Sequence, residues 1–178
     1  KVAATRFAEA GLSVVIADLD AAALVTAEAD VRAAAANGAD VIAVPTDVSN
    51  ADSVANLADT AFKVGEIAVL MNNAGISRPT GSWDNADTWR QLIEVNLFGV
   101  VNGVQTFLPR MIAAARPAVV INTGSKQGIT TPPGNPAYNV TKAGVKVITE
   151  MLAHDLREAG APISAHLFVP GFTYTNMI

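Results

Sequence analysis

The sequence predicts a doubly wound α/β fold, in which a mostly parallel sheet carries helices on both faces. Strand-like apolar runs alternate with helix-like segments five times, and the connections between them are mostly short. The runs are continuously apolar rather than alternating, which is typical of strands buried on both faces of a parallel sheet. This repetition indicates successive βαβ units and therefore parallel strands.

The first elements follow from helix stop signals and one buried run. The opening residues up to Ala10 are tolerable helix formers, and Gly11 supplies a C-terminal stop. The run 12–17 is apolar and rich in β-branched residues, so it is expected to form a buried strand. Asp20 can cap the next helix, which is rich in alanine and extends to Asn37-Gly38.

The next segment repeats this pattern with a different start signal. A second strand is expected at 41–44. Ser49, with Asp52 three residues later, resembles a capping box and predicts a helix that ends near Lys63. A third apolar run at 67–71 completes this part of the alternation.

The rest of the chain contains the longest predicted helices. A loop rich in Gly, Pro, Ser and Asn fills 75–85, and a long helix with apolar residues near helical spacing then covers 87–115. The remaining elements are a strand at 118–121, a Gly/Pro loop at 124–136, a helix at 137–159 and a strand at 163–169.

Composition limits the classes of function. The 178 residues are 51% hydrophobic and 16% charged, which indicates a folded chain rather than a disordered one. The net charge of −4 argues against nucleic acid as a partner, and no apolar run is long enough to span a membrane. The absence of cysteine excludes disulfides and thiolate metal sites, and only two histidines are present, so no metal site is predicted. The absence of cysteine also fits a cytoplasmic location.

Tyr138 and Lys142 carry the strongest chemical signal. Residues at i and i+4 lie on one helix face, one turn apart. A phenol with an ordinary pKa of about 10 is a poor acid–base catalyst at neutral pH, and an adjacent ammonium favours the phenolate and lowers that pKa. The pair is therefore a candidate general acid/base, although the same spacing also arises by chance in many helices.

Two polar residues strengthen this hypothesis. Ser125 follows the strand 118–121 and could donate a hydrogen bond to a substrate oxygen; alternatively, it satisfies backbone groups of its own loop. Asn96 interrupts the apolar face of the long helix, and a buried Asn needs partners. A satisfied local helix distortion is the alternative. Neither His is near Ser125 in sequence and no Gly-x-Ser-x-Gly turn surrounds it, which disfavours a hydrolase.

Taken together, these residues resemble the short-chain dehydrogenase/reductase family over essentially the whole chain. The resemblance implies a Rossmann-like fold and an enzyme that transfers a hydride between a nicotinamide cofactor and an alcohol or carbonyl substrate. A non-catalytic nucleotide-binding protein or a truncated paralogue remains the alternative, because a fold alone does not decide function. The matches, in the family's order, are Asn72-Asn73-Ala74-Gly75, Asn96, Ser125, Tyr138 with Lys142, and Pro170-Gly171 followed by Thr175.

The resemblance also implies a role for each residue. Tyr138 would exchange a proton with the substrate oxygen, Lys142 would bind the nicotinamide ribose and lower the Tyr138 pKa, and Ser125 would hydrogen-bond the substrate. Asn96 would hold a water in a proton relay to Lys142. Further cofactor contacts would come from Asp47, Val48, Asn73, Ala74, Gly75, Pro170, Gly171, Thr173 and Thr175.

Asp18 predicts the choice of cofactor. It ends the strand 12–17, where a carboxylate can accept hydrogen bonds from the adenosine ribose hydroxyls. The same charge would repel a 2′-phosphate by about 1–4 kcal/mol at ~4 Å, and no Arg stands beside it in sequence. NAD(H) is therefore favoured over NADP(H). The alternative is that Asp18 merely caps the helix that starts near Asp20.

The helices 87–115 and 137–159 predict self-association. Both carry apolar residues beyond a single stripe, so each has two surfaces to bury. The resemblance implies that these helices pair across a two-fold axis, in a homodimer or homotetramer with an isologous interface.

The chain is expected to be one Rossmann-like domain, residues 1–178, truncated at both ends. It opens within a helix that has no N-cap, whereas the family begins with a strand and a glycine-rich turn. In the strand order 3-2-1-4-5-6, that strand would lie between the strands 12–17 and 67–71. The family also adds a substrate lid and a last strand after Thr175. The chain alone is therefore expected to be inactive.

Overall fold

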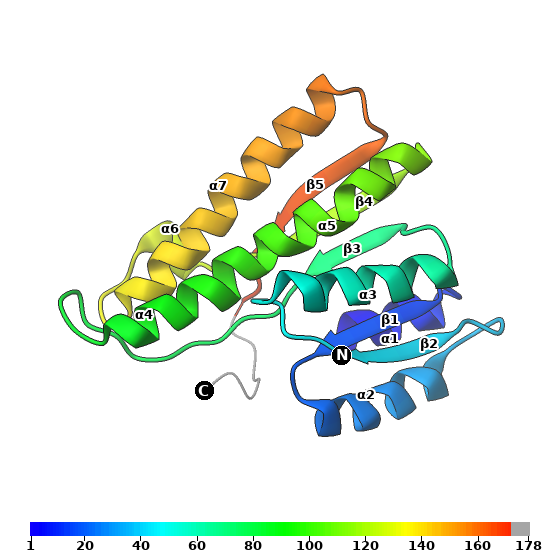
Figure 1. Ribbon diagram of the computed structural model, residues 1–178, viewed down its shortest axis with the longest axis horizontal. Coiled ribbons are helices and arrows are strands. Elements are labelled where there is room, and N and C mark those ends of the chain that lie inside the picture. Colours follow the sequence, from blue (N-terminus) through cyan, green and yellow to red (C-terminus); the bar gives the residue numbers. More distant parts are fainter. Residues whose placement is uncertain (172–178) are drawn as a thin grey trace. The chain divides into compact units, whose positions relative to one another are not determined.

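The computed structural model describes residues 1–171 and confirms the predicted α/β class (Figure 1). It contains two compact units, Lys1–Glu66 and the chain from Ile67 onward. Every strand pair in the described residues is parallel, and helices flank the strands in both units. In the described range, no helix combines the length and apolar character needed to cross a membrane.

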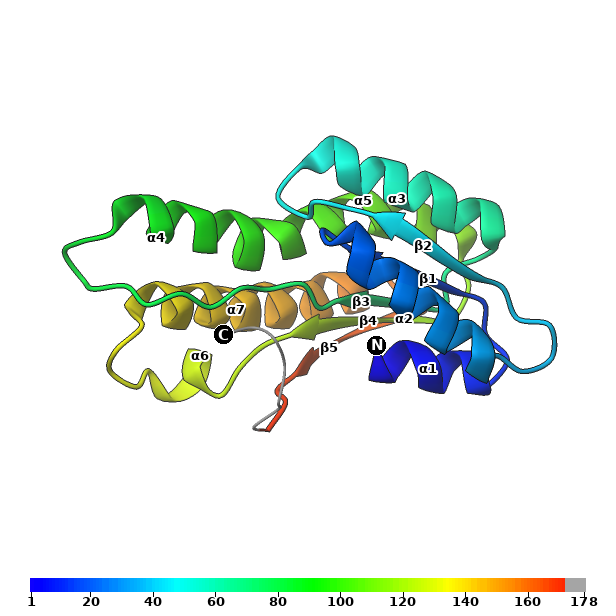
Figure 2. The ribbon, with the colours of Figure 1, turned by 90° about the horizontal axis from the view of Figure 1, so that it is seen from below.

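The first unit is built around a two-stranded parallel sheet. Helices α1 and α2 lie on one side of this sheet and α3 on the other (Figure 2). Ala8, Val31 and Val41 are buried together in its core. The elements in chain order are α1 (Val2–Glu9), β1 (Val14–Asp18), α2 (Ala21–Ala34), β2 (Val41–Pro45) and α3 (Ala51–Val64).

Local sequence explains where these helices start and end. Gly11 has a φ of 84°, the left-handed conformation that ends α1 cheaply at glycine. The Asp20 carboxylate accepts hydrogen bonds from the amides of the first turn of α2, as expected. The predicted cap of α3 is wrong by one residue. Asn50 caps this helix by accepting a hydrogen bond from the Ser53 amide, whereas Ser49 binds the carboxylate of Asp47.

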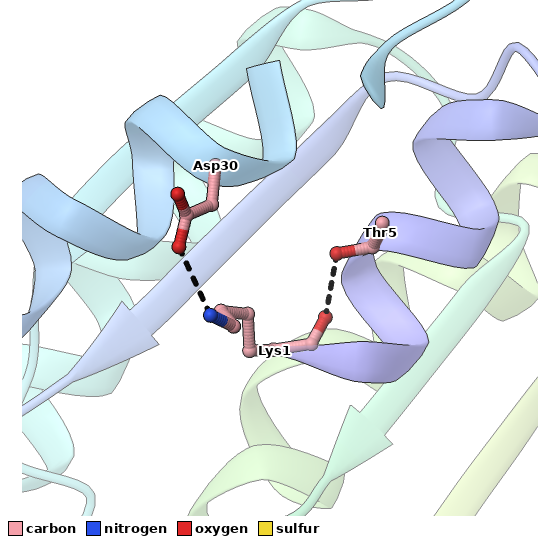
Figure 3. A network of polar contacts seen from close by, with 3 residues as sticks. All are labelled: Lys1, Thr5 and Asp30. Carbon is pink, nitrogen blue, oxygen red and sulfur yellow. Dashed lines mark hydrogen bonds and ion pairs between the residues drawn. The ribbon is translucent and has the colours of Figure 1, made fainter. Parts of the chain in front are cut away.

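An ion pair joins α1 to α2 at the surface of the first unit. Lys1 Nζ lies 2.9 Å from a carboxylate oxygen of Asp30, and the Thr5 hydroxyl donates to the Lys1 carbonyl (Figure 3). Both charged side chains are largely exposed, so this pair adds at most about 1 kcal/mol to stability.

The second unit contains a three-stranded parallel sheet in the order β3-β4-β5. Helices α5 and α7 lie along one face of this sheet (Figure 1). The neighbours within both sheets are those that the sequence predicted. The elements in chain order are β3 (Val69–Asn72), α4 (Ala86–Ile93), η1 (Glu94–Phe98), α5 (Gly99–Ala114), β4 (Ala118–Thr123), α6 (Gln127–Thr130), α7 (Pro136–Glu158) and β5 (Ile163–Phe168).

Two predicted segments differ from the structure. The helix expected over 87–115 is interrupted by the π-helical segment η1, because the side chain of Asn96 binds a neighbouring loop. Short π segments of this kind are frequent at functional sites. The segment 124–136, expected to be a loop, contains the single turn α6. Four residues are too few to show a helical period, and the turn starts where the Gln127 amide donates to Ser125 Oγ.

A chain of side-chain amides and hydroxyls, of which Asn122 and Thr149 are buried, connects β3 and β4 to α7. Asn72 Nδ2 donates to Asn122 Oδ1 at 2.8 Å, and Asn122 Nδ2 donates to Thr149 Oγ1 at 3.0 Å. The Thr149 hydroxyl in turn donates to the carbonyl of Val145 on α7. Because every link is satisfied, this network specifies how the two strands sit against the helix. It therefore fixes the residues at the carboxyl ends of the strands.

Candidate active site

The four predicted catalytic residues lie around the carboxyl ends of β3 and β4. Tyr138 is in the first turn of α7 and Lys142 is one turn further on, while Ser125 follows β4 and Asn96 lies in η1. Their exposed fractions are 6% for Tyr138, 4% for Lys142 and 0% for Asn96. Three side chains this polar are rarely so buried without a specific set of partners.

Ser125 influences the ionisation of Tyr138. A hydrogen bond from its side chain favours the ionised phenol and opposes the effect of burial. Burial is the larger influence and raises the pKa of Tyr138 above its ordinary value. The expected lowering of this pKa is therefore wrong for the chain by itself. Tyr138 is a protonated phenol at neutral pH and can act as a proton donor.

Lys142 lies beneath the ring of Tyr138 but directs its hydrogen bond elsewhere. Its Nζ is 5.8 Å from the centre of the Tyr138 ring and donates to the carbonyl of Thr123 at 2.9 Å. Burial lowers the pKa of Lys142 to about 8. The ammonium is therefore charged at neutral pH, but it sits in a site that penalises its charge.

The amide of Asn96 holds the loop that follows β3. Its Oδ1 accepts from the Ile76 amide at 2.7 Å, and its Nδ2 donates to the Ile76 carbonyl at 2.9 Å. The same Nδ2 lies 3.4 Å from Thr141 Oγ1. Both polar atoms of the side chain are engaged with protein groups, as the alternative of a satisfied helix distortion expects. The proton relay through a water stays a prediction.

Gly75 brings Asn96 and Lys142 into the same neighbourhood. A Cβ atom added to Gly75 would lie 3.3 Å from Asn96 Oδ1 and 3.5 Å from Lys142 Nζ. Together with the Ser125 bond to Tyr138, this places all four predicted residues in one connected cluster of the second unit. A side chain at position 75 would press on this cluster, so glycine keeps the site open.

Thr123 belongs to this cluster, although the sequence analysis did not select it. Its carbonyl accepts the hydrogen bond from Lys142, and its hydroxyl donates to Asn73 Oδ1 at 3.1 Å. It thereby joins the ammonium to the loop after β3. Its position as the last residue of β4, two residues before Ser125, was the one available signal.

The predicted cofactor residues of the first unit lie at the carboxyl ends of β1 and β2. Asp18 ends β1 and is exposed, and one of its oxygens accepts from the Asp20 amide at 3.1 Å. Asp20 rather than Asp18 is the cap of α2, but the bond to the Asp20 amide gives Asp18 a local role at the start of this helix, so its contact with a cofactor stays a prediction. The carboxylate of Asp47 accepts two hydrogen bonds from Ser49 and so shapes the turn that contains Val48.

The predicted cofactor residues of the second unit fall on the loops after β3 and β5. Asn73 and Ala74 are exposed and precede Gly75, while Pro170 and Gly171 follow β5. Thr173 and Thr175 lie outside the described residues.

Comparisons with known proteins agree with this fold. The family model for short chain dehydrogenases matches residues 1–178. A 1-deoxy-11-beta-hydroxypentalenate dehydrogenase from Streptomyces exfoliatus is 37% identical over 97% of this chain and 62% of its own length. A 3-oxoacyl-[acyl-carrier-protein] reductase from Staphylococcus aureus is 35% identical over 85% of this chain and 61% of its own length.

Solved structures give the same result. A short-chain dehydrogenase/reductase from Burkholderia phymatum, in complex with NAD, matches with a TM-score of 0.90 and 39% identity, covering 96% of this chain and 61% of the other. An NAD⁺-bound xylitol dehydrogenase matches with a TM-score of 0.86 and 28% identity, covering 94% of this chain and 64% of the other.

Fold and site define a Rossmann-like α/β protein with a buried tyrosine–lysine pair at the carboxyl edge of its sheet. The chain belongs to the short-chain dehydrogenase/reductase family of oxidoreductases. It spans about three fifths of the length of the curated relatives described above.

Proposed function

We propose that the protein containing this chain is an NAD-dependent oxidoreductase that interconverts an alcohol and a carbonyl compound, with Tyr138 as its acid/base. The observation that carries this proposal is the burial of Tyr138 and Lys142 one helical turn apart, with Lys142 Nζ 5.8 Å from the centre of the Tyr138 ring. A non-catalytic binding protein on this fold has no physical need to bury these groups together.

Tyr138, Ser125 and Lys142 have different roles in the proposed proton transfer. In the reducing direction, Tyr138 gives its phenolic proton to the substrate oxygen, which the Ser125 hydroxyl orients. The charge of Lys142 then stabilises the phenolate that remains, 5.8 Å from its ring centre. A bound nicotinamide would supply the hydride at the substrate carbon. In the oxidising direction, the phenolate takes the proton back.

The side chains present fit a dinucleotide cofactor. Asp18 offers an exposed carboxylate at the end of a parallel strand, the place where ribose hydroxyls are bound in such sheets. Gly75 carries no side chain beside Lys142 Nζ, where a Cβ atom would come within 3.5 Å of the ammonium. Asn73, Ala74, Pro170 and Gly171 would provide further contacts, and so would Thr173 and Thr175.

Turnover by the intact protein tests this function. The test follows NADH oxidation and NAD⁺ reduction with simple ketones, a 3-oxoacyl thioester and a polyol, the last two suggested by the names of the relatives. Turnover of one member of this panel would support the proposal. Binding of NADH without turnover of any member would favour the non-catalytic alternative.

Replacing Asp18 with Asn is expected to relax the preference for NADH over NADPH. The wild-type protein should bind NADH more tightly, because the carboxylate repels a 2′-phosphate. Removing a repulsion of ~1–4 kcal/mol should shift the ratio of the two dissociation constants toward NADPH by about fivefold or more. Asp20→Asn is the matched control, since it removes a nearby charge and keeps a capping side chain. Tighter NADPH binding by the wild type would refute this role.

We further propose a homodimer or homotetramer that pairs the helices predicted at 87–115 and 137–159. In the structure, the first of these comprises α4, η1 and α5, and the second is α7. Large apolar side chains are exposed on both, including Phe98, Ile112, Val147 and Met151. The double variant Val147→Glu, Met151→Glu is expected to dissociate the intact protein in light scattering, whereas Val25→Glu on α2, also an exposed position, should not. A monomeric wild type would contradict this assembly.

Two further predictions complete the proposal. Residues 1–178 belong to a single Rossmann-like domain, and the protein works in the cytoplasm, as its cysteine-free composition suggests.

A further inference from the structure

The first turn of α7, which carries Tyr138, depends on a residue from a distant loop. The first amides of a helix have no partner within the helix. Pro136 has no amide proton, and the Tyr138 amide donates to the side chain of Asn135, the N-cap. The amide of Ala137 has no such local partner. It donates to the hydroxyl of Thr80, which lies 57 positions earlier in the chain.

The Thr80 hydroxyl acts as acceptor and donor at the same time. It accepts from the Ala137 amide at 3.3 Å and donates to Asn135 Oδ1 at 3.1 Å. Thr80 is 7% exposed and Ala137 is 0% exposed, so water does not replace these bonds easily. One buried hydroxyl therefore serves both the cap residue and the amide next to Tyr138.

The loop that carries Thr80 is itself held on both sides. Asn135 Nδ2 donates to Ser77 Oγ at 3.4 Å, and Trp89 Nε1 donates to the Gly81 carbonyl at 2.9 Å. The paired bonds from Asn96 fix Ile76 at the start of the same loop. Thr80 is therefore attached to a restrained segment and can transmit that restraint to α7.

Apolar packing alone does not give Tyr138 the same restraint. Its ring packs with Leu92 and Ala137, and Ile76 and Trp89 lie against this group. Such contacts bury the ring but are not directional. The bond from the phenol to Ser125 needs a defined position for the helix turn, and a shift of about 1 Å at a reacting group can cost ~10²-fold in rate.

We propose that Thr80 is a positioning residue for Tyr138: its hydroxyl, acting through Ala137 and Asn135, fixes the first turn of α7 so that the phenol meets Ser125. This inference rests on the proposed function, because it assigns Tyr138 a reaction in which its position matters. Among the common side chains, only Ser and Thr offer a small hydroxyl that can donate and accept here.

The experiment compares Thr80→Val with Thr80→Ser in the intact protein. Valine keeps the shape and removes both hydrogen bonds, and serine restores the hydroxyl. Thr80→Val is expected to lower kcat by about 10–100-fold with little change in the KM for NADH, and Thr80→Ser to recover most of the loss. Thr60→Val is the matched control, since that hydroxyl donates only to a carbonyl of its own helix, α3.

Amide hydrogen exchange at Ala137 and Tyr138 provides a readout that does not need turnover. Thr80→Val should speed exchange at these two amides by about tenfold or more, while exchange in β4 stays unchanged. A normal kcat in Thr80→Val, a loss that serine does not recover, or unchanged exchange at both amides would each overturn the inference. If the wild type turns over nothing, the proposed function fails by itself. Exchange then still decides whether Thr80 fixes this turn.

Discussion

Replacing Tyr138 with Phe is expected to lower kcat by about 10²–10⁴-fold, the usual contribution of a positioned acid/base. The variant loses one oxygen and keeps the ring that packs with Leu92 and Ala137, so the fold and the affinity for NADH should change little. The measurement is steady-state turnover of the intact protein on the substrate found in the panel, with NADH affinity measured separately.

The neighbouring hydroxyl gives this prediction a graded control. Ser125→Ala removes the hydrogen bond that lowers the pKa of Tyr138, so that burial acts on the phenol unopposed. The pH–rate profile of Ser125→Ala should therefore shift to higher pH. Its kcat should also fall, but by less than in Tyr138→Phe. Equal turnover by wild type and Tyr138→Phe would sink the assigned mechanism, whatever Ser125→Ala does.

Replacing Lys142 with Met is expected to damage activity without damaging stability. The variant loses the charge that stabilises the phenolate, and the loss of one such electrostatic group costs about 10²–10³-fold in kcat. The free energy of unfolding at pH 7 should be unchanged or higher, because Met fills the buried space without a charge to desolvate. The lost bond to the Thr123 carbonyl offsets part of this gain.

The pH dependence of this stability difference has a definite sign. Burial lowers the pKa of Lys142 from 10.5 in the unfolded chain to about 8 in the folded one. Between these values the unfolded chain binds more protons, so this group makes wild-type stability rise with pH from about 8 toward 10.5. Below pH 8 the charged Lys142 destabilises the folded chain to its full extent. The stability advantage of Lys142→Met should therefore shrink as the pH rises through this window.

Lys146 provides the matched control on the same helix. It is partly exposed and pairs with Glu150 at 2.8 Å, an i,i+4 contact worth at most about 1 kcal/mol. Lys146→Met should retain activity and, because it keeps the buried Lys142, its stability should change with pH as that of the wild type does. A Lys142→Met variant that kept wild-type kcat, or was unfolded at pH 7, would contradict the assigned environment.

The sequence could predict the elements whose signals are local. Continuous apolar runs marked the five strands, and Gly11 and Asp20 marked helix boundaries correctly. A helix distortion at Asn96 was one of two possibilities that the sequence left open, and the choice depends on hydrogen bonds to Ile76, which is 20 residues away. The turn α6 also depends on a distant element. A Cβ on Gly128 would lie 2.5 Å from the backbone of Lys142, so only glycine lets this turn pack against α7.

The site residues also divide into those with a local sequence signal and those that depend on distant contacts. Ser125, Tyr138 and Lys142 have chemistry and spacing that can be recognised from the residues alone. Thr80 and Thr123 act through a hydroxyl or a carbonyl toward partners far away in sequence, and threonine is too common in loops and strand ends to stand out. The direction of the Tyr138 pKa shift could not be predicted either, since it depends on burial, which outweighs the opposing hydrogen bond with Ser125.

Isotope transfer tests the central claim most directly. The intact protein and its Tyr138→Phe variant are given NADH carrying deuterium at both C4 positions and the ketone that the panel identifies, and the product is analysed by mass spectrometry. The account predicts an alcohol with one deuterium at the carbinol carbon, formed about 10²–10⁴-fold more slowly by the variant. An alcohol without deuterium, or equal rates of labelling by the two proteins, would contradict it.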